Sequence, residues 1–231
     1  MLRPGLLLAL TIPLLAGCST FAFPPSRALD DLAAMRRAGY PSFKGLGRVE
    51  VDEKGRKFIG IIHLALDGER FRMEVSHPTG KTILAVAGEE GNILRLDPDT
   101  GAKTELNEGF PLAGNNGAPW ALVGVMVTGS PPPVSKIKSI RVEDGVSIVA
   151  ASEPSMTFHY RDGRLLMLEG GSPLSYTFHP GPLTEGPLAP YLKWFQVTFR
   201  GSKTMVEWDE IEQGAGFPDG FFRFEDFSGD F

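Results

Sequence analysis

The chain has 231 residues, of which 42% are hydrophobic and 22% charged, and its formal net charge is −5 at pH 7. This composition is typical of a folded globular protein and excludes a largely disordered chain. A net negative charge without a basic patch argues against nucleic-acid binding and against electrostatic docking on anionic lipid. The 28 glycines and 19 prolines favour many short strands joined by turns, with little helix.

The N-terminal residues predict a lipoprotein signal peptide. Arg3 supplies a positive charge, residues 6–15 form an apolar run, and the sequence Leu-Ala-Gly-Cys ending at Cys18 matches a bacterial lipobox. The alternative is an ordinary secretory signal with an incidental cysteine. Cys18 is the only cysteine, and lipidation would leave no unpaired thiol in an oxidising compartment. We expect a signal peptide at 1–17 and a tether at 18–25 that begins with lipidated Cys18.

The lipid on Cys18, a palmitate-type acyl group, is the only attached group that the sequence predicts, and no cofactor is expected. Two or three acyl chains on one cysteine give a stable membrane anchor. Ser19 stands where an aspartate would favour retention in the inner membrane. The expected location is therefore the periplasmic face of the outer membrane. No later apolar run reaches the 18 residues that a membrane-spanning helix needs.

The folded region opens with a predicted helix and a β-meander. Residues 26–39 have Ser26 as an N-cap, acidic residues early, basic residues late and an apolar stripe at helical spacing. Residues 47–75 predict three strands, with turns at 52–55 and at Asp67-Gly68. The predicted pairs are Val49 with Phe58, Leu64 with Phe71, and Ile62 with Met73. Residues 70, 72 and 74 should then lie on a second, solvent-exposed face.

The rest of the chain continues this pattern. Strands are predicted at 81–87, 93–97 and 102–106, and residues 119–127 read as a short helix over the sheet or as a buried strand. The second half predicts a three-residue loop at 143–145 that pairs Ile140 with Ile148. Further predicted pairs are Tyr160 with Leu165, Phe158 with Met167, Val197 with Val206, Phe199 with Thr204, and Phe195 with Trp208.

The predicted fold is mainly β: a strongly curved, unclosed antiparallel half-barrel of about eleven strands with one or two covering helices. A flat sheet of this size would leave an apolar face uncovered. One domain at 26–212 and a Phe-rich acidic tail at 213–231 are expected, and the tail reads as a covering segment, a docking peptide or a partly disordered end. The expected inward side chains suit a filled core or an apolar cavity equally well. They are Phe58, Ile62, Leu64, Phe71, Met73, Val75, Phe158, Tyr160, Met167, Phe195, Val197, Phe199 and Trp208.

The chain resembles the LolA/LolB-type periplasmic lipoprotein carriers, and LolB-like outer-membrane lipoproteins in particular. The resemblance rests on the lipobox, the FKGLGRV stretch at 43–49, the RFR stretch before the HPTG turn at 77–80, and the PWALVG stretch at 119–124. It implies a half-barrel whose cavity receives acyl chains. The expected cavity lining is then the set of inward side chains given above together with Trp120. The receptor member of the family carries an exposed leucine after its third strand. The matching turn, 76–81, has none.

Catalysis has little support in the sequence. The four histidines are scattered without metal-ligand spacing, and no GxSxG nucleophile motif is present. The leading prediction is a monomeric lipoprotein that binds acyl chains of lipids or lipoproteins, in contact with a periplasmic carrier or an envelope protein. The alternatives are a structural lipoprotein of an envelope assembly with a filled interior, and a hydrolase with an unrecognised site.

Overall fold

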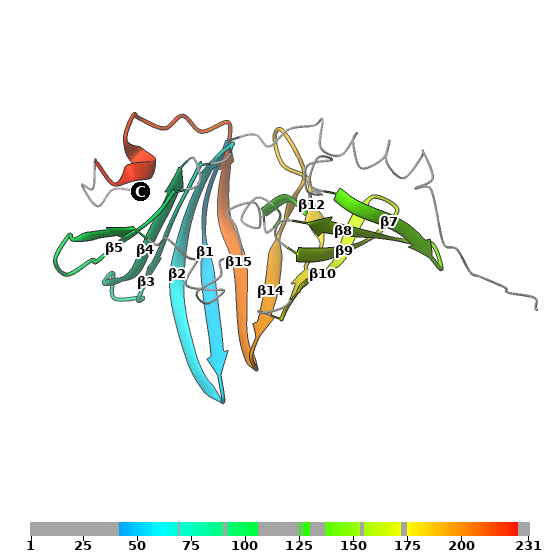
Figure 1. The fold of residues 1–231 in the computed structure, drawn as a ribbon. Coiled ribbons are helices and arrows are strands. Elements are labelled where there is room, and N and C mark those ends of the chain that lie inside the picture. The colour runs from blue at the N-terminus through cyan, green and yellow to red at the C-terminus, as the bar shows by residue number, and fades with distance from the viewer. Residues whose placement is uncertain are drawn as a thin grey trace, which may run out of the picture.

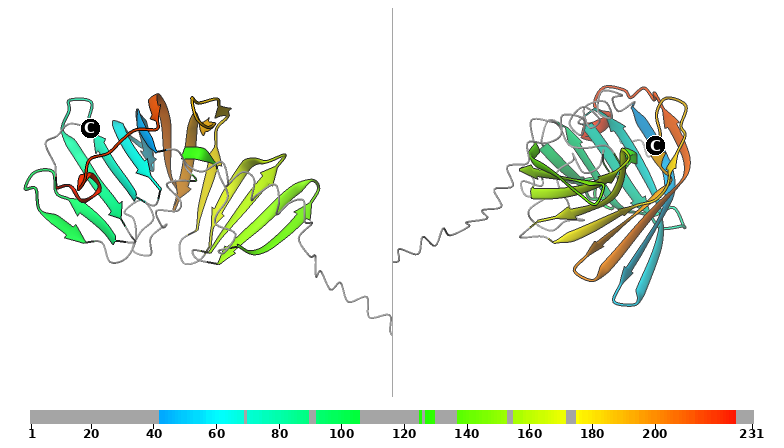
Figure 2. Two further views of the ribbon diagram at one scale, coloured as in Figure 1. Left: turned by 90° about the horizontal axis from the view of Figure 1, so that it is seen from above. Right: turned by 90° about the vertical axis from the view of Figure 1, so that its right-hand side faces the viewer.

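A single curved antiparallel sheet dominates the computed structural model, which describes residues 42–68, 70–89, 92–105, 125, 127–129, 137–152, 155–171 and 175–225. Thirteen strands form this sheet in the order β6-β5-β4-β3-β2-β1-β15-β14-β11-β10-β9-β8-β7. The edge strands β6 and β7 do not pair, so the sheet curls without closing (Figures 1 and 2). The predicted half-barrel is confirmed, with more strands than the expected eleven.

The strands of the first half are β1 (Phe43–Glu53), β2 (Arg56–Asp67), β3 (Arg70–Ser76), β4 (Thr82–Glu89), β5 (Asn92–Leu96) and β6 (Lys103–Glu105). Those of the second half are β7 (Ile137–Glu143), β8 (Val146–Ser152), β9 (Ser155–Arg161), β10 (Arg164–Gly170), β11 (Tyr176–Pro180), β14 (Trp194–Phe199) and β15 (Ser202–Gln213). A separate two-stranded sheet, β12 (Leu183–Thr184) with β13 (Tyr191–Leu192), lies within the expected proline-rich connection. A short 3-10 helix, η2 (Phe221–Arg223), follows β15.

The last strand joins the two halves of the sheet. β15 pairs with β14 on one side and with β1, the first strand, on the other. All other neighbours within each half follow chain order, except for the small β12–β13 excursion. The sheet is therefore two meanders joined through β15 into one continuous sheet.

Four hairpins turn on two residues with positive φ, as a type I′ turn requires. In each pair the second residue is glycine: Lys54-Gly55, Asp144-Gly145, Asp162-Gly163 and Arg200-Gly201. The first residue has φ of 48° to 52° in all four. Glycine tolerates this backbone because it has no Cβ.

The observed strand registers differ from the predicted ones by two positions in three hairpins. Val49 pairs with Gly60 rather than Phe58, Leu64 with Met73 rather than Phe71, and Val197 with Thr204 rather than Val206. The predicted turns lie at 52–55 and 67–68, whereas the last strand pairs before these turns are Glu53–Arg56 and Asp67–Arg70, and the β14–β15 turn follows the pair Phe199–Ser202. A shift of two positions leaves every side chain on its expected face, because the side-chain period of a strand is two. By the same shift, Phe199 pairs with Ser202 and Phe195 with Val206.

Two registers in the second half differ in another way. The β7–β8 loop has two residues rather than three, so Ile140 pairs with Val149 and Ile148 lies on the other face. In β9–β10 the predicted pair Tyr160–Leu165 is confirmed. A register irregularity between Leu165 and Met167 then places Leu168, not Met167, opposite Phe158. A β-bulge adds one residue to a strand and reverses the faces that follow it.

The second face of β2–β5 is covered, which corrects the predicted solvent-exposed face. Residues 214–225, named here the C-terminal strap, run back from β15 and lay η2 against β3 and β4 (Figure 1). Phe221 and Phe222 pack with Ala65, and Phe224 packs with Ala85, Ala87 and Leu96. The described part of the Phe-rich tail is thus a covering segment.

The strap buries an ion pair. The Arg72 and Glu74 side chains are 1% and 9% exposed, and Arg72 Nε and Nη2 donate to Glu74 Oε1 at 2.9 and 2.6 Å. The Arg72 guanidinium lies 4.5 Å from the ring centroid of Phe221 and 4.9 Å from that of Phe224. Aromatic faces attract a guanidinium, so the strap supplies both cover and electrostatic support.

Candidate functional site

The concave face of the sheet carries one continuous apolar cluster that draws side chains from both halves, from Ile93 on β5 to Ile140 on β7. Eight of the predicted inward side chains are buried in it with at most 5% of their surface exposed: Ile62, Leu64, Phe71, Met73, Phe158, Tyr160, Phe195 and Trp208. Phe58, Val75 and Val197 are half-buried and pack against the cluster. Strand alternation, which puts every second side chain on the same face, explains why distant strands contribute to one surface.

Three predicted residues are not placed in this cluster. Met167 is half-buried and displaced by the register change in β10. Phe199 is half-buried at the end of β14, where the Arg200 guanidinium lies 5.1 Å from its ring centroid. Trp120 lies outside the described residues, as do Cys18 and the expected helix at 26–39. For residues 119–127, Val125 and Val127 are helical, as is Thr128 just beyond, and both valines are buried in the cluster.

The cluster also contains side chains that the sequence pattern did not predict. Leu168 replaces Met167 because of the bulge, and Phe178 is completely buried on β11. Phe43 contacts Trp208 in an edge-to-face arrangement with ring centroids 5.6 Å apart. The alternation of Phe43 with Gly45, Gly47 and Val49 is the signal that identifies it.

Trp208 lies over two glycines of β1. A Cβ added at Gly45 or Gly47 would lie 3.1 or 3.0 Å from the indole, and one at Gly47 would lie 2.3 Å from the Glu207 carbonyl oxygen. β1 and β15 shift register between Leu46 and Gly47, next to Trp208. The FKGLGRV stretch therefore provides a flat surface on which the indole rests.

Two buried polar atoms on this side of the sheet have no hydrogen-bond partner within the described part of the chain: the Trp208 indole Nε1 and the Tyr176 hydroxyl. Burial raises the pKa of Tyr176 above its ordinary value, so the hydroxyl stays protonated. An unsatisfied buried donor costs about 1–3 kcal/mol. Both donors are suited to a carbonyl or ester oxygen, or to a water molecule.

A pocket of about 310 Å³ opens beside the same core. Its wall includes Leu165 and Leu192 from the concave cluster and Gly129 after the helical residues. Leu166 and Leu183, which are 43% and 40% exposed, lie on its rim, and Arg164 is its one charged lining residue. None of the predicted cavity residues lines this pocket.

The described residues contain little that suggests catalysis. They include no group of three or more His, Cys, Asp or Glu placed to hold a metal ion. His159 contacts Glu169 at 3.2 Å, and His77 bonds Thr79 within the 77–80 turn. Burial lowers the pKa of His63, and Glu74 partly offsets this effect. No helix in these ranges is long and apolar enough to cross a bilayer.

Comparison with known proteins identifies the fold as LolA/LolB-like. A protein named "putative outer membrane lipoprotein-sorting protein domain" from Vibrio parahaemolyticus superposes with a TM-score of 0.64 at 10% identity, over 84% of this chain and 95% of that one. A LolA superfamily protein from Nitrosomonas europaea gives 0.61 at 11% identity, over 84% and 96%. A DUF1329 family protein from Desulfovibrio piger gives 0.60 at 11% identity, over 86% and 97%. No family model and no curated protein matches the sequence.

Proposed function

We propose that this protein is an outer-membrane lipoprotein, anchored through lipid on Cys18, that binds acyl chains of lipids or lipoproteins on the concave face of its sheet. A role in lipoprotein localisation follows from this proposal. The observation that carries it is the continuous apolar cluster on the inner face of an open sheet. Burying an acyl chain there gains roughly 0.8 kcal/mol per CH₂ group.

Further features support this assignment. The half-buried side chains Phe58, Val75 and Val197 pack against the buried cluster and offer apolar surface that a guest chain would cover. The Trp208 and Tyr176 donors are available to an oxygen of an acyl ester or amide. The superposed proteins include one whose name states lipoprotein sorting.

A second candidate is an accessory lipoprotein of an envelope assembly with a filled interior. The complete burial of Phe158, Phe178 and Trp208 favours it, because such side chains already fill their space. This candidate predicts a stable protein partner and no acyl ligand.

Two adjacent residues of β2 provide the test. Phe58 is half-buried on the concave face, whereas Ile59 is 48% exposed on the other face. A fluorescent fatty acid is titrated into the mature chain carrying Cys18→Ser, so that no anchor contributes. We expect Phe58→Arg to weaken binding by at least about tenfold, or 1.4 kcal/mol.

Ile59→Arg is the matched control, with the same charge added one residue away, and should bind as the parent does. Equal affinities for both variants, or no binding by a parent that is folded by circular dichroism, would refute the proposal and favour the filled interior.

A further inference from the structure

The paired hairpins β1–β2 and β14–β15 end in a basic tip, defined here as Lys54, Arg56, Lys57, Arg200 and Lys203. The two loops are 145 positions apart in the chain, from residue 55 to residue 200 (200 − 55 = 145). They meet because β1 pairs with β15 as far as Asp52–Lys203. This corrects the expectation of a surface without a basic patch, since the patch exists only after folding.

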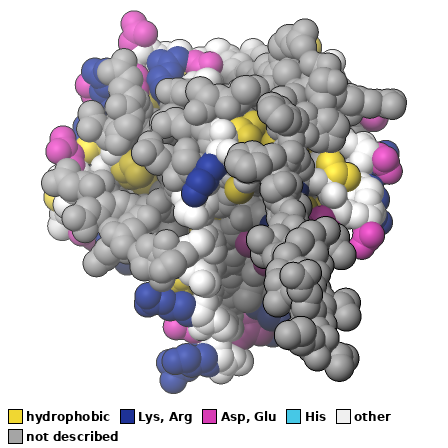
Figure 3. Space-filling model, turned by 45° about the vertical axis from the view of Figure 1, so that its right-hand side comes forward, with side chains coloured by type: hydrophobic (Ala, Val, Ile, Leu, Met, Phe, Trp, Pro, Cys, Tyr) yellow, Lys and Arg dark blue, Asp and Glu magenta, His cyan; other side chains and the backbone are white. Residues whose placement is uncertain are grey.

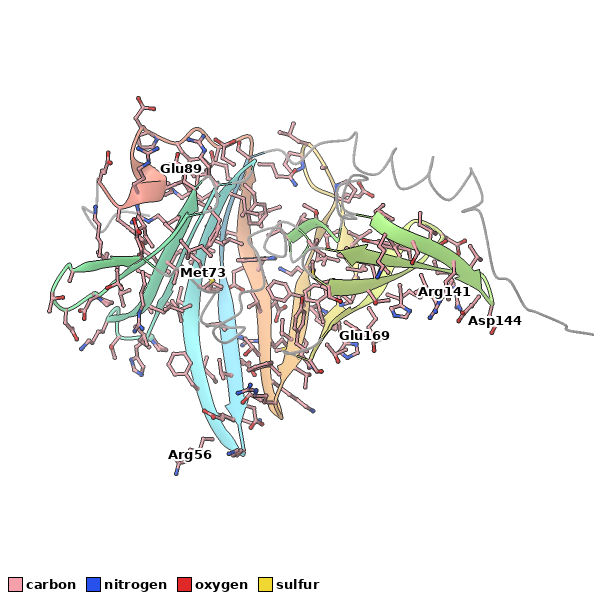
Figure 4. The ribbon with its side chains drawn as sticks, in the orientation of Figure 1. Arg56, Met73, Glu89, Arg141, Asp144 and Glu169 are labelled. Carbon is pink, nitrogen blue, oxygen red and sulfur yellow. The ribbon has the colours of Figure 1, made fainter. Side chains whose placement is uncertain are left out.

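The tip projects from the sheet. β3 ends at Ser76, which lies opposite Ile61, so residues 56–60 of β2 extend past their neighbour. At about 3.3 Å per residue this is a reach of roughly 17 Å. Arg56 points away from the sheet at the lower end of the molecule (Figure 4), and Lys and Arg side chains gather at that end in the space-filling view (Figure 3).

The five cations are exposed, and none of them forms an ion pair with a carboxylate of the described residues. Only Asp52 and Glu53 carry negative charge on the tip itself, and Asp52 Oδ1 already accepts the Gly55 amide at 3.0 Å. Elsewhere several exposed arginines are paired, as Arg48 is with Glu50 and Glu207. The tip is thus a local positive surface on a chain of net charge −5.

Apolar side chains lead from the tip to the core. Val51 pairs with Phe58 directly above the β1–β2 turn, and both pack against the concave cluster. Val197 on β14 also packs against the concave cluster, and Phe199 is half-buried beside Arg200. Cations at the outer end and hydrocarbon side chains behind them match the two ends of an anionic phospholipid.

We infer that the basic tip docks on membrane surfaces that contain anionic phospholipids. Each Lys or Arg near such a surface contributes about 1 kcal/mol at low salt, and the attraction weakens as salt rises. The inference is independent of the acyl-chain site, because headgroup contact at the tip requires no chain on the concave face.

Vesicle co-flotation tests the inference. The mature chain carrying Cys18→Ser is mixed with vesicles of equal parts phosphatidylcholine and phosphatidylglycerol, and separately with phosphatidylcholine alone. We expect binding to the first only, and loss of that binding in high salt. The triple variant Arg56→Gln, Lys57→Gln, Lys203→Gln should bind the anionic vesicles roughly 100-fold more weakly.

The control removes the same charge elsewhere through Arg95→Gln, Lys138→Gln and Arg161→Gln, all at exposed positions away from the tip. It should keep the binding of the parent. Equal losses in the two triple variants, or a parent that ignores anionic vesicles, would overturn the inference. Charged residues also protect projecting strand edges from pairing with other chains. Self-association of the tip variant by light scattering, with vesicle binding unchanged, would assign the cations that role instead.

Fatty-acid titration of the same variants keeps the two proposals apart. The tip variant should retain acyl binding, so a loss of vesicle binding alone concerns the tip and a loss of acyl binding alone concerns the concave face.

Discussion

The two faces of the sheet are apolar in different ways. The concave face is apolar because strand alternation directs side chains from strands far apart in the chain into one cluster. The opposite face of β2–β5 carries Arg72 and Glu74 and is covered by the C-terminal strap with its phenylalanines. The comparison teaches that alternation identifies which residues share a face, but not whether a distant segment covers that face.

The largest effect is expected in the concave core. Phe158→Ala should lower the free energy of unfolding by about 3–5 kcal/mol, because Phe158 is fully buried at the centre of the cluster. Urea denaturation followed by fluorescence measures this. Ile59→Ala, at an exposed position, should change little, and a similar cost for both would contradict a single core on the concave face.

On the strap side, the chain offers two Arg-x-Glu pairs for comparison. Glu74→Gln should cost about 3 kcal/mol, because it leaves Arg72 buried with its charge uncompensated. Glu143→Gln acts on the exposed Arg141–Glu143 pair and should cost at most about 0.5 kcal/mol. Thermal unfolding of both variants gives the difference. Equal costs would mean that the strap does not bury Arg72 in solution.

Substitution of a glycine under Trp208 tests how closely β1 and β15 approach each other on the concave side. Gly47→Ala should destabilise by about 2 kcal/mol, since its Cβ would lie 2.3 Å from a backbone oxygen. Gly216→Ala is the control, because a Cβ there meets nothing within 4 Å. A neutral Gly47→Ala in chemical denaturation would show that β1 and β15 do not approach as described.

The smallest effect concerns pH. Burial holds the pKa of His63 below its ordinary value of 6.5, so the unfolded chain takes up this proton at a higher pH than the folded chain. The stability tied to a neutral His63 is therefore complete above pH 6.5 and declines as the pH falls through 6.5 toward the lowered pKa. Melting curves of His63→Gln should show a shallower loss of stability over this range than the parent. An identical pH profile would argue against burial of His63.

Most of the fold was predictable because strand alternation and glycine turns are local signals. The faces of Ile62, Leu64, Phe71 and Met73 were correct although their pairing was off by two residues, since a shift of two preserves the face. Met167 was misplaced because a bulge leaves no clear mark in an unbroken apolar run. The basic tip and the covered Arg72 were missed for another reason: both depend on contacts between segments more than a hundred residues apart.

Native mass spectrometry of the mature chain, purified from a bacterial host with Cys18→Ser, tests the central claim most directly. We predict adducts with the masses of fatty acids or phospholipids, present in Ile59→Arg and reduced in Phe58→Arg. A parent protein that carries no acyl adduct and takes up none when incubated with phospholipid vesicles would contradict a concave face that binds acyl chains.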